Sequence, residues 1–304
     1  MNFELSQPKQ IISLSSSAHI VSVEVNVWTA TKQDRAISNE VTSMKNADSE
    51  AGKFTKNLLS SSPEHKALMN YRQTVYNWLQ RSTYDWSGSS RLLPLVNLEK
   101  FMKEFNQHEI EFNKLLDVFI AKYPQIVSDA AFKQGDMFDR SQYPDVANVR
   151  SKFRIKLFVT TVPNNDFRSS ISSVIAEDLK NHYERQVAEI IDNVMTDASE
   201  RFLEIASRIS NACTEATPDE DGKVKRKKIY DTTVTQAKEI CVTLKEFNLT
   251  NNPQLEEARQ RLENALRDVT VDDLRESSYV RSVVKNDVDD ILSKFAPLKS
   301  MMSN

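Results

Sequence analysis

The most regular pattern of apolar positions lies between residues 98 and 119. Apolar or aromatic side chains recur there at alternating steps of three and four: Leu98, Phe101, Phe105, His108, Phe112, Leu115 and Phe119. This spacing keeps one narrow seam of an α-helix facing a single partner surface, so it predicts a core helix. We expect this helix to end at Tyr123–Pro124, because a proline disfavours helical geometry in the residue before it, and to resume over residues 125–133.

Two stretches alternate apolar and polar residues with the period of a half-buried β-strand, at Val21–Trp28 and at residues 153–159. We expect these two strands to pair. Two strands alone are marginal in water, so they should pack on helices. Helical spacing predicts three helices between them, at residues 46–60, 63–81 and 94–123. The turn-rich passage Ser87–Ser90 separates the last two helices.

The C-terminal half carries a long apolar stripe that neither proline nor glycine interrupts. It runs from Phe167 to about Cys213 and predicts a helix of about 70 Å, at 1.5 Å per residue. Shorter periodic stretches follow at residues 229–248, 253–269 and 278–295. The predicted fold class is therefore α+β and mostly α. A small antiparallel β pair packs on helices, and a long antiparallel helical stalk or bundle follows.

These patterns divide the chain into three parts. Residues 1–17 are polar and serine-rich, and we interpret them as a flexible N-terminal segment. Residues 18–163 form the predicted α+β domain, and residues 164–304 form the predicted helical hairpin or bundle domain. A two-stranded sheet leaves two edges with unpaired backbone groups. The N-terminal segment or another subunit should cover these edges. In the second case we expect a homo-oligomer that associates through the sheet edge or the stalk.

Composition narrows the class of protein. The formal net charge of the 304 residues is -3, and the four glycines are isolated: Gly52, Gly88, Gly135 and Gly222. Phosphate-binding loops and dinucleotide turns need several glycines close together, so neither is expected. Cys213 and Cys241 are too few for a disulfide framework and favour a reducing compartment. No apolar run is long enough to span a bilayer and no secretory pattern is present, which predicts a cytoplasmic protein without membrane contact.

The reactive side chains do not form a recognisable catalytic or metal-binding set. The four histidines share no metal-ligand spacing with one another or with the cysteines: His19, His65, His108 and His182. We interpret His108, on the helical seam, as a core histidine bonded to a neighbour. No residue group resembles a nucleophile with its base. We therefore predict no enzymatic activity and no catalytic, cofactor-binding or metal-ligating residues.

The second predicted strand suggests a nucleic-acid interface. Its basic residues Lys152, Arg154 and Lys156 project from one face at steps of about 6.6 to 6.8 Å, close to the phosphate spacing of an extended single strand. Arg150 precedes them and Phe158 follows. The competing interpretation is that Glu24 on the opposing strand pairs with one of these bases, and that the face is only solvated.

A second basic group follows the acidic sequence Asp219–Gly222. Its five members are Lys223, Lys225, Arg226, Lys227 and Lys228. At the tip of a projecting helical hairpin, such a cluster can meet phosphates or an acidic patch on a partner. The competing interpretation is a solvated loop that the neighbouring acidic residues neutralise.

An ordered set of short motifs spans most of the chain. These are the valine strand ending at Trp28, Ala51-Gly52-Lys53 with Lys56 and Leu58-Leu59, Arg91-Leu92-Leu93-Pro94 leading to Phe101-Met102, Tyr123-Pro124, Phe138-Asp139 to Tyr143-Pro144, Lys152-Phe153, Asp166-Phe167-Arg168 and Asn248-Leu249-Thr250. With this set, the chain resembles a family of uncharacterised proteins from tailed bacteriophages and integrative elements. The resemblance implies that its gene accompanies those of a MoxR-type AAA+ ATPase and a von Willebrand A-domain protein, or phage replication and recombination genes. The motifs are turn and packing residues, so no catalytic residue is implied.

The leading functional expectation is a non-enzymatic helical adaptor or assembly protein of a phage or mobile element. It would self-associate and work with an AAA+ ATPase system, because the chain has no phosphate loop and so would not be the motor. The first alternative is a single-stranded DNA-binding or recombination accessory protein, which would use the two basic groups. A weaker alternative is a virion structural or scaffold component, a role that long helical hairpins serve well.

Overall fold

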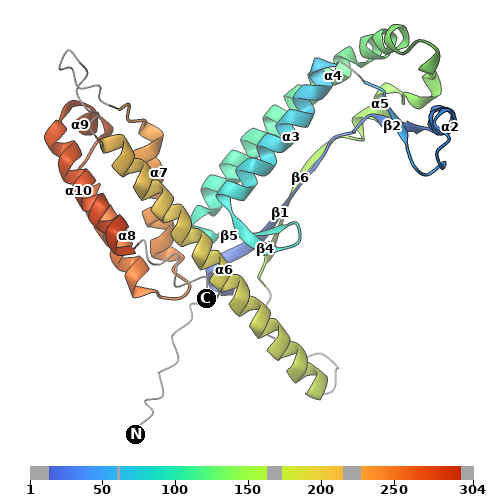
Figure 1. Cartoon of the computed structure of the whole chain (residues 1–304). Helices are drawn as coiled ribbons and strands as arrows, with labels where there is room; N and C mark the ends of the chain where they lie inside the picture. The colour runs from blue at the N-terminus through green and yellow to red at the C-terminus, as the bar shows by residue number, and fades with distance from the viewer. Residues whose placement is uncertain (1–13, 60–61, 163–172, 215–226, 296–304) are drawn as a thin grey trace. The chain divides into compact units, whose positions relative to one another are not determined.

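The computed structural model describes residues 14–59, 62–162, 173–214 and 227–295, and side chains are described for all of these except residues 173–181. Close contacts divide the chain into two compact units. Unit 1 comprises Met1–Val21, Thr83–Glu99 and Val159–Asn304, and unit 2 comprises Ser22–Ser82 and Lys100–Phe158. Most described residues are helical and a minority are in strands (Figure 1), so the predicted fold class, α+β and mostly α, is confirmed.

Two long helices, α3 (Pro63–Ser82) and α4 (Leu98–Gln134), supply most of the core of unit 2. Pro63 opens α3 as predicted, and the Ser62 hydroxyl accepts a hydrogen bond from the His65 N–H at 3.1 Å. The helices meet through aromatic side chains, and the ring of Trp78 stacks on that of Phe101 with centroids 4.6 Å apart. Aromatic rings bury large apolar areas, so this seam contributes strongly to the stability of the unit.

Helix α4 does not end at Tyr123, as the sequence predicted, but continues through Pro124 to Gln134. Pro124 has no N–H for the carbonyl of Ile120, which normally disfavours a helix interior. Tyr123 and Val127, on either side of it, are both buried. Packing on both sides of the proline therefore outweighs the missing hydrogen bond.

The main sheet has four strands in the order β4-β5-β1-β6. Their bounds are β1 Ala18–Asn26, β4 Tyr84–Ser87, β5 Ser90–Pro94 and β6 Arg154–Thr161. The two predicted strands, β1 and β6, are neighbours as expected. The sequence analysis missed β4 and β5, whose antiparallel hairpin turns at the predicted Ser87–Ser90 passage. Gly88 at this turn has a φ of 59°, which glycine adopts without steric cost.

The helix predicted at residues 46–60 is wrong. The chain there forms a second, two-stranded antiparallel sheet with a helix between its strands: β2 (Thr31–Asp34), α2 (Arg35–Met44) and β3 (Phe54–Asn57). Asn46 has a φ of 50°, a left-handed conformation that ends α2 and cannot belong to a continuous right-handed helix. The apolar spacing that suggested a helix is incidental, because Ala47, Ala51 and Phe54 are exposed.

The C-terminal part of unit 1 is a helical bundle (Figure 1). Its helices are α6 Ser173–Cys213, α7 Asp231–Glu246, α8 Pro253–Ala265, α9 Val271–Glu276 and α10 Ser278–Phe295. Helix α6 packs against α7 and α10, and α8 packs against the same two helices. With 41 residues, α6 is about 60 Å long at the α-helical rise. The start predicted for it, at residue 167, lies outside the described residues.

The core of unit 1 is not confined to the C-terminal half of the chain. It includes Leu14, Ala18, Tyr84 and Leu92 together with the buried side chains of the bundle. Leu14 begins a short helix, α1 (Leu14–Ser17), so the described end of the predicted flexible segment is ordered. This division differs from the contiguous one predicted at residue 163, because separate stretches of chain complete one core.

The remaining described elements are short. They are the 3-10 helices η1 Leu95–Asn97, η2 Gly135–Met137 and η3 Arg140–Gln142 and the helix α5 Val146–Arg150. Asp145 caps α5 by accepting a hydrogen bond from the Asn148 N–H at 2.8 Å. Asp145 thus marks the start of α5, which ends at Arg150, four residues before β6.

Candidate nucleic-acid and protein interfaces

The basic residues predicted around β6 lie on its outer face. Lys152, Arg154 and Lys156 are exposed, whereas Phe153 and Ile155 between them are buried. Strand β6 begins at Arg154, and alternate residues of a strand point to opposite faces, so Arg154 and Lys156 share one side. Lys152 lies in the turn that joins α5 to β6. The buried side faces α4, since the rings of Phe153 and Phe119 are 5.2 Å apart. The packing of unit 2 therefore fixes the direction of the basic row.

Two of the bases have acidic partners. The Arg154 guanidinium donates a hydrogen bond to Glu24 on β1, as the competing interpretation expected of one of the bases. Arg150 lies 2.8 Å from the Asp117 carboxylate. The hydrogen bond from Arg154, supported by one from Asn26, lowers the pKa of Glu24 below its ordinary value. Glu24 thus stays ionised at neutral pH, and the pair is an exposed ion pair of small net stability.

Two aromatic side chains flank the same face. The Lys152 ammonium lies 5.9 Å from the centre of the Trp28 ring, within the range of a cation–π contact. Phe158 is 50% exposed and occupies the outward parity of β6, two residues beyond Lys156. The outward residues of β1, Glu24 and Asn26, lead to Trp28 at the same two-residue step. The face therefore presents bases and aromatic rings together.

A second surface lies on α2, whose buried side is polar. Ser38 and Thr42 are both buried. The Ser38 hydroxyl accepts a hydrogen bond from the Phe54 N–H at 3.0 Å, and the Thr42 hydroxyl donates to the Ser38 carbonyl at 3.0 Å. On another side of the helix, Val41 is 49% exposed and Met44 is 74% exposed. This reverses the usual arrangement, in which a surface helix buries its apolar stripe.

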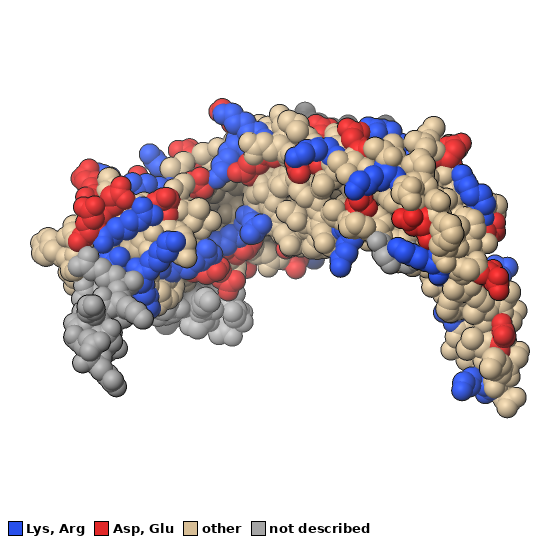
Figure 2. Space-filling model, turned by 90° about the horizontal axis from the view of Figure 1, so that it is seen from above, with Lys and Arg blue, Asp and Glu red and all other residues tan. Residues whose placement is uncertain are grey.

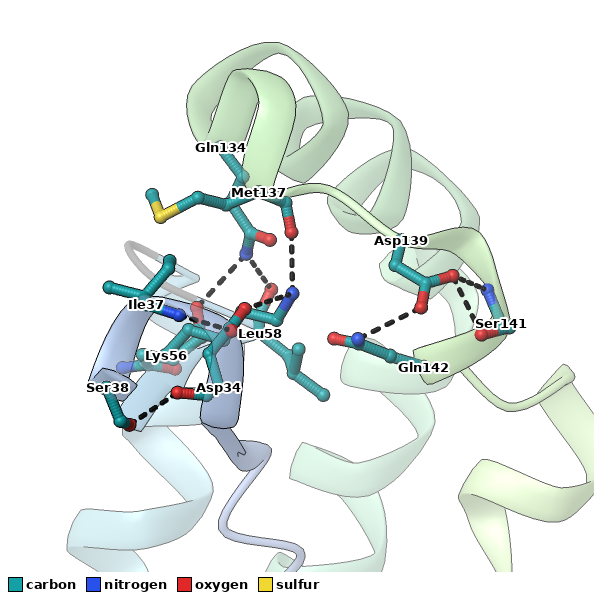
Figure 3. Close-up of polar contacts among 11 residues, drawn as sticks. Asp34, Ile37, Ser38, Lys56, Leu58, Gln134, Met137, Asp139, Ser141 and Gln142 are labelled. Atoms are coloured by element: carbon teal, nitrogen blue, oxygen red, sulfur yellow. Dashed lines mark hydrogen bonds and ion pairs between the residues drawn. The ribbon is translucent and has the colours of Figure 1, made fainter. Parts of the chain in front are cut away.

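A cluster of polar contacts holds α2 and its two strands to the end of α4 (Figure 3). Lys56 of β3 is 6% exposed, and its ammonium donates to the Met137 carbonyl at 2.6 Å and lies 3.8 Å from the Asp34 carboxylate. The Gln134 amide donates to the Leu58 carbonyl at 3.2 Å. Buried polar groups need such partners, so the cluster fixes the place of α2.

No family model matches this sequence, and no curated protein or solved structure is significantly similar to it. Over the described ranges, with their gaps, no helix is both long and apolar enough to cross a membrane. Within the same part of the chain, no three His, Cys, Asp or Glu side chains are grouped in a way that could hold a metal ion.

The basic group at residues 223–228 belongs to unit 1, and only its end is described. Lys223, Lys225 and Arg226 lie outside the described residues. Lys227 and Lys228 are exposed, and the Lys228 ammonium lies 5.1 Å from the centre of the exposed Tyr230 ring. The four bases at residues 150–156 belong to unit 2.

Charged side chains of both signs are mixed on one face of the molecule (Figure 2). On the face shown in Figure 2, lysines and arginines alternate with acidic residues and do not form one broad basic field. This agrees with the net charge of -3. Any attraction for an anionic ligand therefore comes from a local row of cations, because mixed exposed charges cancel beyond a Debye length.

His108 makes the contacts expected of a core histidine. Its Nδ1 lies 2.9 Å from the Tyr71 hydroxyl, and its ring lies 4.7 Å from that of Trp78. Burial lowers the pKa of His108, although the nearby Glu104 opposes this shift. His65 is also tied to the backbone, with Nε2 2.6 Å from the Trp28 carbonyl oxygen. Both imidazoles thus have structural partners.

Two features of these surfaces were not predicted from the sequence: Trp28 as a member of the sheet face, and the whole α2 surface. Trp28 could have been found, because it has the same outward parity as Glu24 in the strand pattern. The α2 surface could not, because the stripe Ile37, Val41 and Met44 would normally predict a buried helix side. Only the burial of Ser38 and Thr42 in the structure shows that α2 buries its polar side and exposes its apolar side.

Proposed function

We propose that this chain is a non-enzymatic adaptor or assembly protein that binds other proteins through the apolar side of α2, in the cytoplasm of a host cell. The observation that supports this most is the exposure of Val41 and Met44 on a helix whose buried side is polar. Apolar side chains gathered on one exposed helix side are typical of protein-interaction sites.

The spacing of this surface favours one kind of contact. Ile37, Val41 and Met44 follow one another at steps of four and three, so they form a single stripe along the helix. A stripe of this spacing fits a helix laid into an apolar groove of a partner. Methionine suits such a contact, because its flexible thioether adapts to an irregular surface.

The resemblance to phage and mobile-element proteins suggests the partner to test first. We propose that the groove belongs to a MoxR-type AAA+ ATPase of the same genetic element, with this chain as its adaptor. Alternatively, the apolar side of α2 binds a second copy of this chain, and the protein then acts in assembly. In either form the partner, and not this chain, would supply any chemical energy.

The experiment compares two double variants of the full chain. Val41→Ser with Met44→Ser removes the α2 stripe, and Ile110→Ser with Val118→Ser is the matched control, since both of its residues are exposed on α4. Binding to the purified ATPase is measured by co-elution, and self-association by light scattering. We expect the α2 variant to lose the complex and the α4 variant to keep it.

Other outcomes would contradict the proposal. A wild-type chain that remains monomeric and binds no ATPase would exclude the adaptor function. Equal loss in both double variants would place the contact elsewhere than α2. Circular dichroism of each variant checks the fold, which should persist because all four substituted side chains are exposed.

A further inference from the structure

The outer face of β1 and β6 in unit 2 is open. Phe153 and Ile155 on the inner side are buried, whereas Lys152, Arg154 and Lys156 on the outer side are exposed. Figure 1 shows α3 and α4 running along one side of these strands. An extended ligand could lie along the other side without displacing part of the core.

The bases form a row with a regular step. Alternate residues along a β-strand are about 6.6 to 6.8 Å apart, so Arg154 and Lys156 place two cations in line on β6. This step suits successive phosphates of an extended single strand. Lys152, in the turn just before the strand, adds a third exposed cation. Helix α5 brings Arg150 to the start of the row, because the helix ends at Arg150 and the chain turns there into Lys152.

Aromatic rings lie at both ends of the row. Trp28 contacts the Lys152 ammonium at one end, and Phe158 is half exposed beyond Lys156 at the other. Unpaired bases stack on such rings, and the stacking tolerates any base because every base has a π-face. A duplex cannot use the rings in this way, since its bases are already stacked and paired.

An acidic side chain on this face gives the site a defined competitor. Glu24 holds Arg154, whereas Arg150 pairs with Asp117 of α4, the helix that packs on the inner side. Both are exposed ion pairs, which contribute little net stability. A phosphate can therefore replace either carboxylate at small cost, but the Glu24 charge remains on the face and weakens binding.

We propose that the outer face of β1 and β6 binds single-stranded DNA. Lys152, Arg154 and Lys156 contact consecutive phosphates, and Trp28 and Phe158 stack on bases at the two ends. The site lies on a different surface from α2 and uses different chemistry. A negative result for DNA binding would therefore leave the proposed adaptor function untouched, and the reverse also holds.

The test is a fluorescence-anisotropy titration of the full chain with a labelled oligothymidylate of about 16 nucleotides, at several salt concentrations between about 50 and 200 mM. Replacement of Lys152, Arg154 and Lys156 by alanine should weaken binding at least about tenfold. It should also reduce the slope of log K against log salt by about 2, because each lost phosphate contact of a single strand contributes about 0.7.

Three further variants separate this site from general charge effects. The triple variant Lys66→Ala, Lys114→Ala and Lys133→Ala makes the same change in net charge on exposed positions of α3 and α4, and it should bind like wild type. Phe158→Ala should weaken binding about tenfold through lost stacking. Glu24→Gln should tighten binding, because it removes the competing carboxylate.

The opposite results are equally clear. No binding at the lowest salt, or equal weakening by the two triple variants, would overturn the proposal. So would tighter binding of the corresponding duplex, because the aromatic ends would then have no role. The Glu24→Gln variant guards against misfolding as an explanation, since a gain in affinity requires a folded face.

Discussion

Lys56 is a buried cation whose partners come from two distant parts of the chain. Its ammonium bonds the Met137 carbonyl, and Asp34, the nearest acidic partner, also caps α2 by accepting a hydrogen bond from the Ile37 N–H at 3.2 Å. A lysine this buried needs its bonds, because an unpaired buried charge is strongly unfavourable. The contacts of one side chain thus help determine which side of α2 faces solvent.

Replacement of Lys56 by methionine should therefore destabilise the protein. The change keeps an unbranched apolar side chain of nearly the same length but removes the ammonium, so the Met137 carbonyl and Asp34 lose this partner. We expect the free energy of unfolding to fall by about 1–3 kcal/mol, as measured by urea denaturation. Lys53→Met is the control, because Lys53 is exposed. Equal stability of the two variants would show that the buried contacts of Lys56 are dispensable.

His108 should make stability depend on pH in a defined window. Burial lowers its pKa in the folded state, so below about pH 6.5 the unfolded chain binds the proton more readily. The contribution of the neutral imidazole is therefore present above this pH and is lost as the pH falls through the lowered pKa. Wild type should lose stability between about pH 7 and pH 5, and His108→Gln should lose less.

Urea denaturation at the two pH values measures this difference. His182→Gln is the matched control, because His182 is an exposed histidine on α6. It should retain the pH dependence of wild type. Carboxylates such as Glu64, whose pKa is lowered mainly by the hydrogen bond from Lys122, act at a lower pH and are common to all three proteins. An unchanged pH dependence in His108→Gln would exclude His108 as its source.

At the scale of elements, α4 shows a conflict between local preference and packing. Pro124 lacks a donor for the carbonyl of Ile120, and an exposed proline inside a helix is about 3 kcal/mol less favourable than alanine. The buried neighbours Tyr123 and Val127 keep the helix continuous. The local strain and the tertiary packing thus act in opposite directions at one position.

Pro124→Ala should therefore stabilise the protein by about 1–3 kcal/mol, because alanine restores the hydrogen bond and relieves the clash with the preceding turn. Denaturation with urea or guanidinium measures the change. Ser128→Ala is the control, one turn later at another exposed position of α4, and it should change stability by less than about 0.5 kcal/mol. A Pro124→Ala variant less stable than wild type would mean that the bend at the proline is needed for packing.

The sequence predicted elements well where periodicity and end signals agreed. Pro63 and Pro253 each mark a helix start that the structure confirms, and the last helix was predicted at residues 278–295, where α10 lies. Prediction failed where the apolar spacing was incidental, as at residues 46–60, and where short strands such as β4 carry little pattern. Periodicity reports the face of an element, and it cannot report which long-range partner covers that face.

The same limit applies to the candidate surfaces. The alternation predicted that Arg154 and Lys156 share a face, because strand parity alone determines it. It did not predict that Lys152 lies in the turn before the strand. No sequence pattern shows that Arg154 is the basic residue that bonds Glu24, or that Lys152 is the one that contacts Trp28. Each contact depends on the register between β1 and β6, which the sequence of one β-strand does not specify.

At the scale of the whole molecule, each unit is assembled from separate stretches of sequence. Unit 1 takes Thr83–Glu99 from the middle of the chain and completes its core with Tyr84. The Tyr84 ring stacks on Phe247 with centroids 5.5 Å apart, and the Arg201 guanidinium lies 4.6 Å from its centre. Burial raises the pKa of Tyr84 to about 12, so the phenol is neutral at physiological pH.

This assembly predicts that residues 164–304 do not form a stable domain alone. The fragment would lack Leu14, Ala18, Tyr84 and Leu92, and it would expose the side of Phe247 on which Tyr84 stacks. We expect it to keep helical circular dichroism but to lose a cooperative thermal transition and to bind a hydrophobic dye. The predicted contiguous domain requires the opposite result, a cooperative transition at the temperature of the full chain.

A single substitution in the full chain tests the same point without cutting it. Tyr84→Ala should lower the free energy of unfolding by about 3–5 kcal/mol, because it removes a fully buried aromatic side chain. Trp86→Ala is a milder control in the same strand, since Trp86 is only partly buried against this core. If Tyr84→Ala were as stable as wild type, the bundle would not depend on the β4–β5 hairpin, and the fragment should then fold by itself.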